Sequence, residues 1–130
     1  METAHYMIAV SGFLGALVAI GHGILCQRFI VRPLETAPID DLRQAGFRKL
    51  FVGPLIHVST FTWLAGGLGL IFAATALSRD ALLAVSVVIQ VSYTHAALLN
   101  IWTARGRHYG GWCLAGISAL LASGIIELAG

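Results

Sequence analysis

Charged residues are scarce in this chain of 130 residues: Lys and Arg number 8, Asp and Glu number 6, and together they make up 11% of the sequence. Soluble globular proteins carry about 25% charged residues. Because 58% of the residues are hydrophobic, a soluble chain of this length would have to bury more apolar surface than a small core can enclose. The net charge of +2 is small and its basic residues are dispersed, which argues against nucleic-acid binding. The composition therefore favours a membrane protein.

The few cysteines and carboxylates of this chain do not have the spacing that common metal, disulfide or catalytic sites require. Cys26 and Cys113 lie in different apolar segments without CxxC or Cys-His spacing, so neither a disulfide framework nor a structural zinc site is indicated. Glu127 is the only carboxylate inside an apolar segment, and it lies near the end of the last one. This scarcity argues against a di-iron site, and against a catalytic triad built on Ser59 or Ser92.

Four apolar segments are long enough to cross a bilayer, which takes about 20 residues. They cover residues 6–27, 50–77, 81–103 and 109–128. The N-terminus lacks the positive charge of a secretory signal, so we expect the first segment to be retained. Short polar turns join the last three segments, which makes neighbouring helices antiparallel. We predict an all-α, integral membrane, antiparallel four-helix bundle that forms a single transmembrane domain over residues 1–130.

Small residues recur every four positions in three of these segments. Such ladders allow helix backbones to approach closely in lipid, where no hydrophobic effect drives helix association. The ladders are Gly15, Ala19 and Gly23 in the first segment, Ala65, Gly69 and Ala73 in the second, and Gly111, Ala115, Ala119 and Ser123 in the fourth. We expect them to form the helix contacts.

The stretch 27–49 is the only long charged part of the chain. Pro38 followed by Asp40 and Asp41 is typical of a helix start, so we predict a short amphipathic helix over 38–49 that lies on the membrane surface; a plain loop is the alternative. Of the 8 Lys and Arg residues, 7 lie on the side of this hinge and only Arg79 lies on the other. The positive-inside rule therefore predicts a cytoplasmic hinge with both termini outside.

Histidines occur at similar depths in the first three segments. At 1.5 Å rise per residue, His22, His57 and His95 lie roughly 9, 12 and 15 Å from the nearest basic edge residue. Because an imidazole facing lipid is costly, we expect all three to turn inward and line one cavity on the hinge side. The nearest candidate hydrogen-bond partners of these histidines are Ser59, Ser92 and Tyr93, and the other candidate site residues near this layer are Asn100 and His108.

Three interpretations of the histidine layer are open. The imidazoles could hold a haem or a transition metal, which requires nitrogen ligands that converge. They could form a path for protons or small molecules. They could also be separate polar groups, each bonded to a neighbour and serving only to hold helices together.

Short motifs of the chain resemble those of a group of small four-span bacterial membrane proteins that have no assigned activity. The motifs are Gly21-His22 leading to Arg28 and Pro33-Leu34, then His57 with Ser59 and Trp63, and the run from Arg105 to Trp112. The group often carries Gly-Glu where this sequence has Cys26-Gln27. The resemblance implies a four-span fold in a bacterial inner membrane and implies no activity.

The functional expectation follows from this absence of a catalytic pattern. We predict a non-enzymatic accessory or interaction subunit of a membrane system, in contact with the lipid bilayer and with other membrane subunits or copies of itself. One alternative is a membrane redox protein that binds haem or a metal through His22, His57 and His95. The other is a small-molecule or proton transporter that works as an oligomer.

Overall fold

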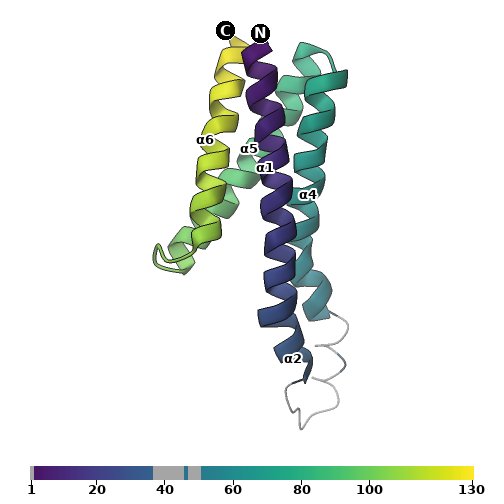
Figure 1. Ribbon diagram of the computed structural model, residues 1–130, viewed down its shortest axis with the longest axis vertical. Coiled ribbons are helices and arrows are strands. Elements are labelled where there is room, and N and C mark those ends of the chain that lie inside the picture. Colours follow the sequence, from purple (N-terminus) through teal and green to yellow (C-terminus); the bar gives the residue numbers. More distant parts are fainter. Residues whose placement is uncertain (1, 37–45, 47–50) are drawn as a thin grey trace.

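Four long helices make up most of the protein. The computed structural model describes residues 2–36, 46 and 51–130, and this part of the chain contains no strand. The elements are α1 (Glu2–Cys26), a π-helix η1 (Gln27–Val31), α2 (Arg32–Thr36), α4 (Gly53–Ala76), α5 (Arg79–Thr103) and α6 (Tyr109–Ala129) (Figure 1). The predicted all-α architecture with four main helices is confirmed. The predicted interfacial helix over 38–49 falls almost entirely outside the described residues.

Each long helix has the length and composition of a membrane span. Four helical stretches combine at least 18 residues with high hydropathy and few charges, which indicates an integral membrane protein. The first of them continues through η1 and α2 to Thr36 and is 35 residues long, well beyond the predicted end at 27. Charge alone does not end a helix, because the Arg28 and Arg32 side chains are exposed and leave the backbone hydrogen bonds intact.

Helix α1 lies at the centre of the arrangement. It packs against α4 and α6, while α5 packs mainly against α6 and makes fewer contacts with α4. Figure 1 shows both termini at one end of the molecule and α5 crossing behind α1, from the α4 side at that end to α6 at the other. At the far end, the α5–α6 turn and α2 therefore lie on opposite sides of the molecule.

Glycines of α1 allow close contact with the backbone of α4 and with one side chain of α5. A Cβ added to Gly67 would lie 2.5 Å from the carbonyl oxygen of Gly12 and 2.8 Å from the backbone nitrogen of Ala16. On the next turn of α1, Gly15 lies directly under the ring of Tyr93, whose hydroxyl donates to the carbonyl of Trp63 at 3.3 Å. The small residues of α1 thus form helix contacts as predicted.

Most of the small residues predicted to form the contact face of α4 do not face the bundle. Ala65 is exposed, and a Cβ on Gly69 would meet nothing within 4 Å; the close contact is made by Gly67 instead. Spacing of four identifies a stripe but does not say which of two neighbouring stripes faces the bundle. In α6 likewise, Gly111 is buried whereas Ala119 and Ser123 are exposed, and the contact with α1 near the termini is made by Gly124.

The end of the bundle near the termini is tied together by one side chain. Arg79, at the start of α5, donates from Nε to the carbonyl of Leu128 at 2.8 Å and from Nη2 to the carbonyl of Ala129 at 3.0 Å. These carbonyls belong to the last turn of α6, where no intrahelical donor is available. A basic side chain at this position also suits the negative end of the helix dipole.

A candidate ligand cleft between two helix pairs

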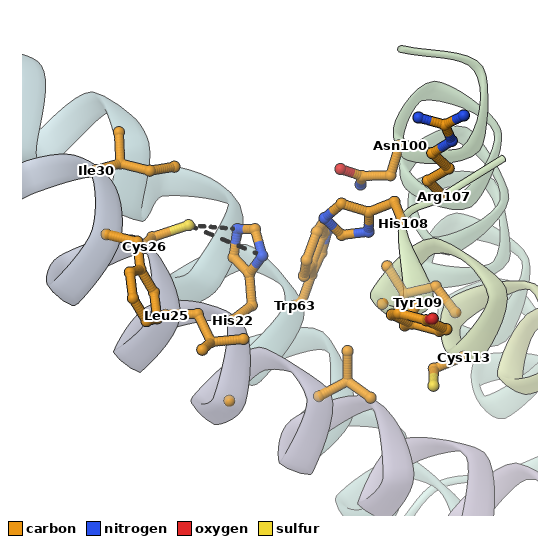
Figure 2. A pocket seen from close by; sticks show the side chains of 15 residues that line it. His22, Leu25, Cys26, Ile30, Trp63, Asn100, Arg107, His108, Tyr109 and Cys113 are labelled. Atoms are coloured by element: carbon orange, nitrogen blue, oxygen red, sulfur yellow. Dashed lines mark hydrogen bonds between the residues drawn. The ribbon is translucent and has the colours of Figure 1, made fainter. Parts of the chain in front are cut away.

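A cleft of about 610 Å³ lies on the hinge side of the bundle, between α1 with α4 on one side and α5 with α6 on the other. In Figure 2 the labelled residues of α1 face those of the α5–α6 region, with Trp63 of α4 between them. Its apolar lining includes Val18, Leu25, Phe29, Ile30 and Leu114. Its polar lining comprises His22, Cys26, Asn100, Arg107, His108 and Cys113.

The packing of Trp63 sets the inner limit of the cleft. This side chain is buried, and its ring centroid lies 4.8 Å from that of His22 with the two planes tilted by 51°. Tyr93, fully buried, holds the backbone of the same tryptophan through its hydroxyl. Trp63 and Tyr93 therefore fill the bundle on one side of His22, and the cleft occupies the other side.

His22 projects from α1 into the cleft and is held there by two neighbours. Its Nε2 lies 3.3 Å from Sγ of Cys26, one helical turn further along α1, and 3.4 Å from Oγ of Ser59 on α4. The predicted pairing of a histidine with Ser59 is therefore found, at a long hydrogen-bond distance.

His57 serves a different purpose, because it links α4 to the π-helix. Its Nε2 donates to Oε1 of Gln27 at 2.9 Å. Within η1, Val31 is buried while Phe29 and Ile30 line the cleft. The hydrogen bond of His57 thus fixes the part of the chain that forms one rim of the cleft.

His108 stands at the opposite rim, where it caps α6. Its Nδ1 accepts a hydrogen bond from the backbone N–H of Gly111 at 2.9 Å. The chain reaches this position through a turn in which Arg105 and Gly106 have φ values of 49° and 78°; glycine adopts the second without strain. Figure 2 shows the imidazole of His108 pointing into the cleft, with the amide of Asn100 beside it and Arg107 at the edge.

The predicted convergence of His22, His57 and His95 is not found. The His95 side chain is exposed, because α5 turns the neighbouring Ala96 and Ala97 into the bundle and His95 points away from them. Among the described residues, no group of three or more His, Cys, Asp or Glu side chains is placed to hold a metal ion. His22 and His108 line the cleft, and His57 and His95 do not.

The other candidate residues are distributed between the cleft and the core. Asn100 lines the cleft and donates to the carbonyl of Ala96 at 2.7 Å. Tyr93 is buried and bonded to a backbone carbonyl instead of a histidine, and Ser92 is half-buried outside the cleft lining. The predicted roles of these two residues as histidine partners are therefore wrong.

Sequence reasoning overlooked three residues of the cleft. Cys26, Arg107 and Cys113 all line it, and both cysteines are free thiols, Cys26 buried and Cys113 exposed. The spacing of the two cysteines could have identified them. Cys26 follows His22 by four positions and Cys113 follows Tyr109 by four, and residues so spaced share a helix face.

Comparisons with protein-family models, with curated proteins and with solved structures found no match to this chain. The function proposed below is therefore inferred from the geometry of the cleft.

Proposed function

We propose that this protein is a non-enzymatic integral membrane protein that binds a small amphipathic molecule in the cleft, and that it serves a membrane system as an accessory component. The observation that supports this proposal most directly is the volume of the cleft together with the side chains that line it. Ligand-binding pockets typically measure about 300–1,000 Å³, with mainly apolar walls and a few polar groups that orient the ligand. The cleft has about this volume, and its polar side chains gather around His22 and His108.

A test can use Trp63 as the reporter, because it borders the cleft while Trp102 and Trp112 are exposed. In a Trp102→Phe, Trp112→Phe background, we expect a dibrominated monoacylglycerol to quench the fluorescence of Trp63 in a saturable manner. Gly21 offers a way to block the site, since it lines the cleft and a Cβ there would meet nothing within 4 Å. Gly21→Leu should therefore abolish saturable quenching without loss of folded protein.

Gly116→Leu is the matched control. Gly116 is also free of neighbours at its Cβ position and lies outside the cleft lining. This variant should bind the probe as the parent does. If quenching of Trp63 rises without saturation, or is unchanged in Gly21→Leu, the cleft is not a binding site.

We further propose a bacterial inner membrane location with the hinge side in the cytoplasm and both termini outside. Support comes from the 7 basic residues on the hinge side against Arg79 alone on the other. The hydrogen bonds of Arg79 to α6 give even that exception a structural role.

The orientation can be checked with single cysteines at two exposed positions, Thr36 and Ser78, in a Cys26→Ala, Cys113→Ala background. A membrane-impermeant maleimide should label Ser78→Cys on intact cells and Thr36→Cys only after permeabilisation. The opposite pattern would reverse the orientation. Labelling of both from outside would contradict the four-span topology.

A further inference from the structure

We infer that the molecule bound in the cleft is an anionic amphiphile, with an oxyanion head, carboxylate or phosphate, at Arg107 and His108 and an apolar chain along α1. This inference rests on the proposed binding function of the cleft and assigns its ligand class. Three features support this ligand class: the hydrogen-bond donor of His108, the positive charge of Arg107, and the apolar wall opposite them.

The capping bond of His108 decides which of its nitrogens faces a ligand as a donor. Because Nδ1 accepts from the N–H of Gly111, the neutral ring carries its proton on Nε2. A ring in this state cannot use Nε2 as a metal or haem ligand, since that requires a free lone pair. With the imidazole directed into the cleft (Figure 2), His108 offers a hydrogen-bond donor to an acceptor there.

Arg107 adds a permanent positive charge to the same rim. It lines the cleft together with His108, and guanidinium groups only donate hydrogen bonds. None of the 15 described residues that line the cleft is Asp or Glu, so the lining itself supplies no counter-charge. A cation at a membrane boundary is stabilised by a negative partner, and carboxylates and phosphates match the fork of a guanidinium.

The wall opposite this rim is suited to a chain of apolar groups. Leu25, Phe29 and Ile30 line the cleft from α1 and η1, and Val18 lies deeper on the same helix. Open space beside Gly21 continues the path between them. A ligand that satisfies both sides therefore carries a charged head and an apolar tail, which neither a free inorganic anion nor a neutral lipid does.

The test compares two probes that share a chain and differ in the head group. Dibromostearate is anionic, and the dibrominated monoacylglycerol is neutral. With Trp63 as sole tryptophan, we expect dibromostearate to bind about tenfold more tightly, as expected for a charge-assisted hydrogen bond. Inorganic phosphate at millimolar concentration should not displace it, because phosphate has no tail to bury.

Two substitutions locate the head group. Arg107→Gln removes the charge, and His108→Asn removes the Nε2 donor while keeping a side chain that caps helices well. The two groups share the tenfold preference, so each substitution should reduce the ratio of the two affinities by roughly threefold, with the larger loss for dibromostearate. Arg105→Gln is the control, because it removes the same charge two residues away. Both arginine side chains are exposed, but only Arg107 lines the cleft, so the control should change the affinity less than twofold.

The outcomes separate the two proposals. Equal affinity for the two probes, or an equal loss in Arg105→Gln, would overturn the anionic head while leaving the binding cleft intact. Displacement by inorganic phosphate would overturn the amphiphile, since the head alone would then suffice. Absence of saturable quenching by either probe would remove the binding function and this inference together.

Discussion

The two ends of the bundle differ in how closely their helices pack. In the half of the bundle nearer the termini, helices approach closely at glycine, as at Gly12 with Gly67 and at Gly124 with the carbonyl of Ala4. Near the hinge, His22 of α1 and Phe29 of η1 line a cleft whose opposite side includes Cys113 of α6. Because dispersion contacts need close approach, stability is concentrated at the first end and binding capacity at the second.

The tilt of α5 makes this difference possible. It is bonded to the end of α6 through Arg79 at the closed end, and at the other end it turns into α6 through Arg105 and Gly106. Between these points its buried residue Tyr93 fills the space above Gly15. Helix α5 is thus held at its start and its middle, which leaves its last turns free to diverge from α1.

The largest effect should come from breaking the glycine contact at the closed end. Gly67→Leu places a side chain against the backbone of α1, which cannot move aside as a flexible side chain would. We expect a loss of about 3 kcal/mol or more in the free energy of unfolding, enough to lower the yield of folded protein sharply. Thermal unfolding in detergent measures it.

Gly69→Leu provides a matched control two residues away on the same helix. Its Cβ position is open, so the same substitution should leave the unfolding temperature within a few degrees of the parent. Equal destabilisation of the two variants would show that the close approach of α1 and α4 does not stabilise the bundle.

A smaller effect is expected from removing the tie between α5 and α6. Arg79→Gln loses two charge-assisted hydrogen bonds to the last turn of α6, which should lower the free energy of unfolding by about 1–3 kcal/mol. Arg105→Gln, at an exposed side chain of the other turn, should change it by less than about 0.5 kcal/mol. A similar loss in both variants would mean that overall charge, and not the capping contact, stabilises this end.

Hydropathy was sufficient to predict the number of long helices and the approximate ends of α4, α5 and α6, but not the end of the first helical stretch. Four long apolar segments can satisfy their backbone groups in lipid only as helices, so composition alone determines that level. Rotation about each helix axis was harder to predict. His95 and Gly69 were both placed inward, and each lies one or two positions away from the residues that α5 and α4 bury.

The site was only half predictable for the same reason. The inward position of His22 could be predicted from depth and polarity, and Ser59, which contacts it, was one of three candidate partners. The place of His108 in the cleft depends on its capping bond to Gly111. A single local bond of this kind leaves no periodic trace in the sequence, so helical patterning does not reveal it.

The unbroken helix from Glu2 to Thr36 is longer than a membrane span. At 1.5 Å per residue its 35 residues measure about 50 Å, against roughly 30 Å of hydrocarbon. His22 lies 20 residues from its start, about 30 Å along, so in a bilayer whose hydrocarbon begins at Glu2 the cleft would lie where acyl chains give way to head groups. A membrane-dissolved amphiphile at that level can reach the cleft by diffusing sideways within one leaflet, and its concentration in that leaflet, not in water, then governs occupancy.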